Sequence, residues 1–134
     1  MVKSRSEEVR ERKICGRYNC AQAVAGAYPD VVGMDEETLN AVTSAFGTGM
    51  GTMEGTCGAL VGAGVIIGLK INDRIRSREL MKEIMTDFKQ ANGSTVCRAL
   101  KGIDTGKPLR DCPGCCADAA RLLEKKLESL QSEL

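Results

Sequence analysis

The cysteines are the residues of this chain whose chemistry stands out, and there are seven of them among 134 residues. They are Cys15, Cys20, Cys57, Cys97, Cys112, Cys115 and Cys116. A cysteine thiolate attacks disulfides and binds metal ions. The sequence contains no histidine, which excludes a cysteine-histidine dyad, a histidine-ligated zinc site and a histidine proton shuttle. Any metal site must therefore depend on sulfur, with carboxylates as the remaining ligands.

Cys57 lies where a glycine-rich loop ends and an apolar helix is expected to begin, in the stretch Gly-Thr-Cys-Gly-Ala-Leu-Val-Gly of residues 55–62. Thr56 is expected to cap this helix, which would place Cys57 in its first turn. Unpaired amides and the helix dipole favour an anion there, so the pKa of the thiol is expected to fall from about 8.5 to between roughly 3.5 and 7.5. The alternative is a packing surface, because glycines such as Gly58 and Gly62 allow helices to approach closely.

Two further cysteines belong to other expected helices. Cys20 falls on the inward face of a helix predicted over residues 5–28, where a buried structural cysteine is equally consistent with the pattern. Cys97 falls in the first turn of a short helix that begins at Ser94 or Thr95. Both are candidate redox or metal-binding residues.

Three cysteines gather at the start of the last predicted helix, and one more lies near the amino terminus. Cys112 and Cys115 form a Cys-x-x-Cys motif, which lowers the pKa of a thiol and permits a short-loop disulfide. Cys115 is a candidate resolving thiol, an additional metal ligand or a residue without a role. Cys116 matches the apolar stripe of its helix and is predicted to be a core residue, whereas Cys15 is predicted to be incidental.

The elements that carry these cysteines are all predicted to be helices. No stretch shows the alternation of a strand, and hydrophobic residues recur at helical spacing in several segments. In segment 77–91, for example, a buried stripe is predicted at Leu80, Ile84, Phe88 and Ala91. The predicted segments are 5–28, 35–46, 57–69, 77–91, 94–100 and 112–129. We therefore expect an all-α, single-domain bundle of five or six helices over residues 1–134. Because the cysteines lie on different helices, only the fold can bring their sulfur atoms together.

Residues 47–55, just before Cys57, contain a Gly-x-Gly-x-Gly run. A nucleotide-binding interpretation lacks support, because no strand precedes the loop and the Lys-Ser/Thr ending of a phosphate loop is missing. The glycines are instead expected to let the backbone turn tightly and lie against the site.

Charge and length exclude several classes of protein. The chain has 19 basic and 18 acidic residues, a net charge of +1 and no basic cluster on an aromatic platform, so nucleic acid is not an expected partner. The apolar segment 57–69 is shorter than the roughly 20 residues that span a membrane. The odd number of cysteines and the charged residues 1–8, which lack the apolar segment of a secretory signal, lead us to expect a cytoplasmic protein.

Residues 57–62, together with Asn-Cys-Ala at 19–21 and with Cys97 and Cys112, resemble the C_GCAxxG_C_C family, whose name denotes redox-active proteins. The resemblance covers nearly the whole chain. It implies redox activity of the clustered cysteines and a link to a membrane transporter system. Three cysteines are additional to the family pattern, so Cys112 and Cys115 compete for its last position.

Thiol-disulfide exchange or electron transfer is the first function that these residues support. Cys57 would attack the disulfide of a partner or an oxidant, and Cys20, Cys112 or Cys115 would resolve the intermediate. Electrons would come from a redox partner protein, because the sequence has no dinucleotide-binding motif.

The second hypothesis is a metal centre, in which Cys20, Cys57, Cys97 and Cys112 bind an iron-sulfur cluster or a zinc ion. The local cysteine spacing of ferredoxins is absent. Backbone amides of residues 47–55 would then donate hydrogen bonds to sulfur and tune the potential.

The third hypothesis is a non-redox helical interaction module whose cysteines are core residues. Leu127, Leu130 and Leu134 would extend the last helix into a homodimer contact. The number of cysteines at predicted helix starts argues against this hypothesis.

Overall fold

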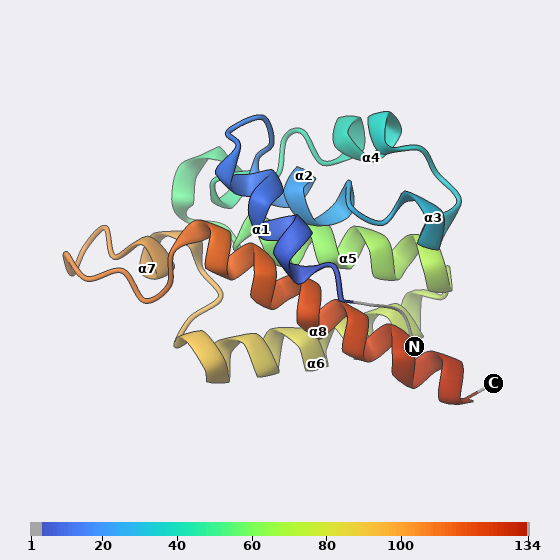
Figure 1. Ribbon diagram of the computed structural model, residues 1–134. Coiled ribbons are helices and arrows are strands. Elements are labelled where there is room, and N and C mark those ends of the chain that lie inside the picture. The colour runs from blue at the N-terminus through green and yellow to red at the C-terminus, as the bar shows by residue number, and fades with distance from the viewer. Residues whose placement is uncertain (1–3, 134) are drawn as a thin grey trace.

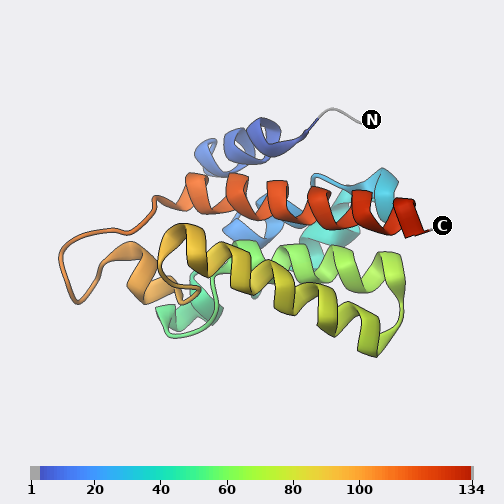
Figure 2. The same ribbon diagram turned by 90° about the horizontal axis from the view of Figure 1, so that it is seen from below.

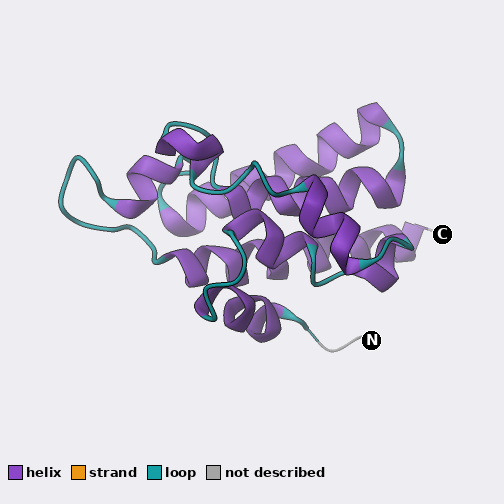
Figure 3. Cartoon of the chain, turned by 90° about the horizontal axis from the view of Figure 1, so that it is seen from above, coloured by secondary structure: helices purple, strands orange, loops and turns teal. Residues whose placement is uncertain are grey.

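The computed structural model describes residues 4–133, and within that range the chain forms nine helices and no strand (Figure 3). The helices are α1 (Ser6–Ile14), α2 (Cys20–Ala25), α3 (Pro29–Val32), α4 (Glu36–Val42), η1 (Gly49–Met53), α5 (Gly58–Ile71), α6 (Arg74–Asn92), α7 (Cys97–Lys101) and α8 (Cys112–Glu133). The predicted all-α class is therefore confirmed. The short helices α2, α3, α7 and η1 raise the number above the five or six expected.

Helix α5 lies at the centre of the molecule, because its sequence is apolar almost all round. It packs against α2 on one side and against α6 and α8 on the other (Figures 1 and 2). A Cβ atom added at Gly62 would lie 2.6 Å from the carbonyl oxygen of Ala21 in α2, closer than any real side chain allows. The expected close packing at this glycine is therefore present, and it brings α2 against the middle of α5.

Helix α6 folds back beside α5 through a tight turn at Asn72, whose φ of 51° is left-handed. The helix begins at Arg74 and not at Ser77, because the Asp73 carboxylate accepts hydrogen bonds from the amides of Ile75 and Arg76. The predicted stripe of α6 is buried at three of its four positions, Leu80, Ile84 and Phe88, whereas Ala91 is exposed.

The helix predicted over residues 5–28 is in fact divided into separate helices. Gly16 has a φ of 80° and follows the end of α1. Asn19 then begins α2 with a capping box, in which its side chain accepts from the amide of Gln22 and the Gln22 side chain accepts from the amide of Asn19. The apolar spacing predicts that Cys20 lies in the interior of a long helix. In the structure Cys20 is instead the first residue of α2.

Arg12 links α1 to the carboxyl end of α2 through hydrogen bonds. Its guanidinium donates hydrogen bonds of 3.0 Å to the carbonyl oxygens of Gln22 and Ala23 and lies 4.0 Å from the centre of the Tyr18 ring. A cation at the end of a helix compensates the negative end of its dipole. The contact fixes where α2, and therefore Cys20, sits relative to α1.

The ends of the remaining helices differ from prediction. Helix α4 ends at Val42 instead of Phe46, and α8 runs past Ser129 to Glu133. Helix α7 begins at Cys97, two to three residues later than the predicted start at Ser94 or Thr95. Leu127 and Leu130 pack against the core of their own chain, and Leu134, the third residue of the expected dimer contact, lies outside the described residues. None of the helices in residues 4–133 is both long enough and apolar enough to cross a bilayer.

Candidate functional site

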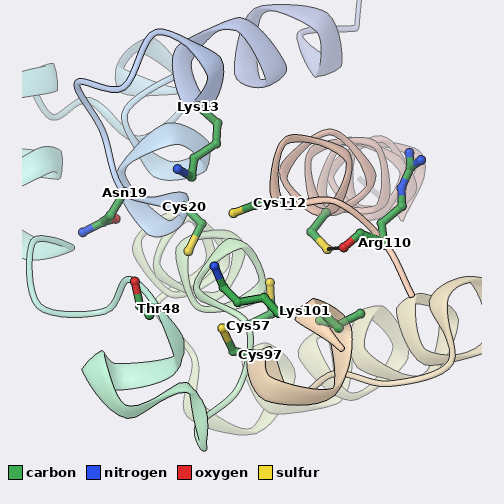
Figure 4. A pocket seen from close by; sticks show the side chains of 11 residues that line it. Lys13, Asn19, Cys20, Thr48, Cys57, Cys97, Lys101, Arg110 and Cys112 are labelled. Carbon is green, nitrogen blue, oxygen red and sulfur yellow. Dashed lines mark hydrogen bonds between the residues drawn. The ribbon is translucent and has the colours of Figure 1, made fainter. Parts of the chain in front are cut away.

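Five of the seven cysteines line one pocket of about 110 Å³ at the end of the molecule where α2, α5, α7 and α8 begin (Figure 4). Its lining residues are Lys13, Asn19, Cys20, Thr48, Cys57, Cys97, Leu100, Lys101, Arg110, Cys112 and Cys115. Cys20, Cys97 and Cys112 are each the first residue of a helix, and Cys57 immediately precedes one. The fold thus brings together cysteines that lie far apart in the sequence.

The sequence leads us to expect Cys57 in the first turn of α5. In the structure Cys57 is instead the residue immediately before the helix. Thr56 does not cap the helix, because it pairs with Val96 in an isolated antiparallel bridge. The amide of Cys57 donates to the carbonyl oxygen of Thr95 at 2.7 Å, and the amide of Cys97 donates to that of Gly55 at 3.1 Å. This short bridge sets Cys57 and Cys97 side by side.

The glycine-rich loop lies against the pocket, as its composition predicts. It contains left-handed residues, among them Thr48, which precedes the helical turn η1, and Met50 within that turn, with φ values of 52° and 64°. Gly49 also has a positive φ, and a Cβ atom there would lie 2.7 Å from the Cβ of Cys97. The loop therefore needs glycine at this position to approach the site.

Gly58 makes room for a second sulfur atom. A Cβ atom at this position would overlap the Sγ of Cys20 and lie 2.6 Å from the carbonyl oxygen of Phe46. The two glycines of the CGAxxG motif thus have different tasks, since Gly58 admits the Cys20 thiol whereas Gly62 admits the backbone of α2.

Cys57 and Cys115 form the first pair of thiols in the pocket. Interaction with the Cys115 thiol lowers the pKa of Cys57; burial and the nearby Cys20 oppose the shift, and the amides of Ala59 and Leu60 add to it. The Cys115 Sγ itself lies 4.0 Å from the carbonyl oxygen of Arg110. The interaction with Cys57, together with burial, raises the pKa of Cys115 far above its usual range. The pair is therefore polarised, with the negative charge favoured on Cys57 and the proton on Cys115.

Cys20 and Cys112 form the second pair. Interaction with Cys112, together with burial, raises the pKa of Cys20 well above its usual range. The pKa of Cys112 is raised to about 11, because its thiol interacts with Cys116 and is partly buried, although Cys20 opposes the shift. Burial also raises the pKa of Cys97. Cys57 is thus the pocket cysteine whose surroundings favour the thiolate.

The remaining cysteines stand outside the pocket lining. Cys116 is fully buried, as predicted for a core residue, and its thiol lies 3.8 Å from the carbonyl oxygen of Cys20. Cys15 is exposed, and its thiol donates to the carbonyl oxygen of Arg12 at 3.1 Å.

Three basic side chains in the pocket wall were not foreseen. Lys13 and Lys101 reach toward the thiols in Figure 4. Lys101 follows Cys97 by four residues on the same short helix, so this neighbour was readable from the spacing. Lys13 comes from α1 and depends on tertiary packing. Arg110 is engaged by Asp118, with an Nε to Oδ2 distance of 3.1 Å.

The thiols do not fit the four-cysteine metal shell considered from the sequence. Within residues 4–133, no three cysteine, aspartate or glutamate side chains converge on a position that could hold one ion. The thiols of Cys57 and Cys20 instead interact in pairs with those of Cys115 and Cys112. We derive no step through a metal.

Comparison with known proteins agrees with the motif. The profile of the family C_GCAxxG_C_C, described as "Putative redox-active protein (C_GCAxxG_C_C)", matches residues 18–126. No curated protein and no solved structure matches the chain. The matched segment contains all five cysteines of the pocket.

Proposed function

Because the chain belongs to the C_GCAxxG_C_C family of redox-active proteins, we propose that it performs thiol-disulfide exchange through Cys57 and Cys115. The observation that carries the proposal is that these two thiols line one pocket, where their interaction lowers the pKa of Cys57 and raises that of Cys115. A thiolate attacks disulfides, and a second thiol beside it resolves the mixed disulfide.

The reaction begins with the Cys57 thiolate attacking one sulfur of a substrate disulfide. A bond forms between Cys57 and that sulfur, the substrate S–S bond breaks, and the other half leaves as a thiolate. Cys115 then loses its proton, which the departing thiolate can take, and attacks the Sγ of Cys57. The second half of the substrate leaves, so two protein thiols become one disulfide and one substrate disulfide becomes two thiols.

The contact with Cys57 favours Cys115 over Cys20 or Cys112 as the resolving residue. The largest influence on the pKa of Cys57 is Cys115, whereas the largest influence on Cys20 is Cys112 and the largest on Cys112 is Cys116. Oxidation of Cys20 and Cys112 to a disulfide would supply two further electrons. Their raised pKa values make these two thiols slower to react than Cys57. Cys97, beside Cys57, is assigned no step.

The oxidised protein needs a reductant, and we propose a redox partner protein that carries a dithiol. The cytoplasm is the compartment in which such a cycle is expected, because its thiols are kept reduced. A link to a membrane transporter system follows from the family resemblance alone, and a homodimer remains a further prediction.

The test is to oxidise the reduced protein without oxygen, using one equivalent of a small disulfide, and to map the product by mass spectrometry. We expect two thiols to disappear and a Cys57 to Cys115 disulfide to form. The variant Cys115→Ser should stop at a mixed disulfide on Cys57. The control Cys15→Ser removes an exposed thiol outside the pocket and should behave as the unmodified chain does. Formation of a different disulfide at the same rate in Cys57→Ser would contradict the proposal.

A further inference from the structure

The wall of the pocket is basic. None of its lining residues is acidic, and Lys13, Lys101 and Arg110 all contribute to it. Arg110 is neutralised by Asp118, whose side chain also pairs with Arg121. For Lys13 and Lys101 the described part of the chain provides no carboxylate as an ion-pair partner. Two uncompensated ammonium groups therefore face the site.

The two lysines approach the thiols from opposite walls. Lys13 is on α1 and acts electrostatically on Cys20 and Cys112, whereas Lys101 is on α7 and acts on Cys97. Figure 4 shows the Lys101 side chain directed toward Cys20 and Cys57. A molecule that enters the pocket therefore meets two positively charged side chains.

We propose that the pocket selects small disulfides that carry carboxylates, with the carboxylates bound by Lys13 and Lys101 while the disulfide reaches Cys57. This inference rests on the proposed exchange reaction and names its substrate class. The volume of about 110 Å³ holds only a few water-sized groups, so it suits the sulfur end of a small molecule better than a folded chain. Attraction by the lysines raises the local concentration of such an anion.

The bonds exchanged are those of the proposed reaction. Cys57 forms a mixed disulfide, Cys115 displaces the second half of the substrate, and two carboxylate-bearing thiols leave. Each thiol departs as an anion beside a lysine, which stabilises the negative charge that develops on its sulfur.

The first experiment compares three small disulfides of similar length: dithiodiglycolate, bis(2-methoxyethyl) disulfide and cystamine. They are anionic, neutral and cationic. Each rate is divided by the rate of 2-mercaptoethanol with the same disulfide, which removes differences in intrinsic reactivity. We expect the anion to react roughly tenfold or more faster than the cation at low salt, and the ratio to fall as salt screens the lysines.

Charge variants assign the effect to the pocket. Lys13→Gln and Lys101→Gln should each lower the ratio of anionic to cationic rates, and the double variant should bring it close to that of 2-mercaptoethanol. The matched control is Lys70→Gln, which removes the same charge from the opposite end of α5. Its ratio should equal that of the unmodified chain.

A second measurement needs no disulfide. Iodoacetate and iodoacetamide alkylate thiolates and differ in charge, so their relative rates at Cys57 report the same preference. A ratio equal to that of 2-mercaptoethanol, unchanged by the lysine variants, would overturn the anion preference whether or not exchange occurs. If this ratio shows the preference but none of the three disulfides oxidises the protein, the exchange reaction fails, and with it the assignment of disulfides as substrates.

Discussion

The two ends of α5 differ in what their residues contribute. At its amino end lie Cys57, the paired thiols and a loop with several left-handed residues. At its carboxyl end Ile66 and Ile67 are almost completely buried among aliphatic and aromatic side chains. Burial of such side chains is worth about 1.5–3 kcal/mol each, whereas the thiol end uses small residues and backbone turns. The comparison teaches that one end of a helix can stabilise the fold through buried side chains while the other end positions the reactive thiols.

The variants Cys57→Ser and Ile66→Ala are expected to differ most, because the first should lower the rate of disulfide reduction and the second the free energy of unfolding. Without Cys57, disulfide reduction depends on the other pocket thiols. Burial and neighbouring thiols raise the pKa of Cys20 and Cys112, so we expect the rate to fall roughly a hundredfold or more, since each pKa unit changes the thiolate fraction about tenfold. Stopped-flow oxidation measures this rate. Ile66→Ala should leave the rate of the folded protein unchanged and lower the free energy of unfolding by about 2–5 kcal/mol.

Denaturant unfolding of the same two variants measures the free energy of unfolding. If both variants lost the same fraction of the exchange rate under conditions in which both are folded, the two ends of α5 would not be independent.

Two glycines of α5 provide the next test. Gly62→Ala forces a Cβ atom against the backbone of Ala21 and should lower the free energy of unfolding by about 1–3 kcal/mol. Gly68→Ala is the matched control, because nothing lies within 4 Å of its Cβ position. It should raise stability by up to about 1 kcal/mol through helix propensity. A destabilisation by Gly68→Ala equal to that by Gly62→Ala would mean that contact with α2 does not distinguish the two positions.

Alkylation at neutral pH sharpens the contrast within the pocket itself. Cys57 has a lowered pKa and Cys112 a pKa raised to about 11, so iodoacetamide should modify Cys57 at least about tenfold faster at pH 7. As pH rises, the Cys57 rate should level off first, while the Cys112 rate increases up to about pH 11. Peptide mapping after timed quenching gives both rates. Equal rates at pH 7 would contradict the polarised pair.

The smallest expected effect concerns a helix cap beside the pocket. Asn19→Ala removes the hydrogen bond to the amide of Gln22 and should lower the free energy of unfolding by about 1 kcal/mol. It should also change the alkylation rate of Cys20, which α2 positions. Asp35→Ala removes the cap of α4, which lines no part of the pocket, so the pocket thiols should keep their rates. If Cys20 were alkylated at the same rate in the two variants, Asn19 would not position this thiol.

Much of the fold follows from local patterns. The apolar spacing of Leu80, Ile84 and Phe88 predicts their burial, and the pattern around Cys97 predicts a short helix there, although the helix begins at Cys97 and not at Ser94 or Thr95. These inferences succeed because a helical stripe depends on neighbours a few residues away. The break after α1 was also readable from Gly16 and Asn19, but the apolar spacing that continues through them hid it.

The arrangement of the site depends on contacts that no local pattern contains. Thr56 is a good capping residue, but it pairs with Val96 from a segment forty residues later, which moves Cys57 out of the first turn. Whether Cys115 or Cys20 lies beside Cys57 depends on how α8 packs against α5. The motif therefore identified the sulfur atoms, whereas their partners needed the tertiary structure.

The long stretch of chain between Cys57 and Cys115 has an energetic consequence. A covalent bond between them would close a loop of roughly 60 residues, and such closure disfavours the unfolded ensemble by about 4 kcal/mol in the chain-entropy model. By thermodynamic linkage, folding favours forming this bond by the same amount. A bond that is easily formed has a low reduction potential, so the reduced protein would be a donor of electrons rather than an oxidant.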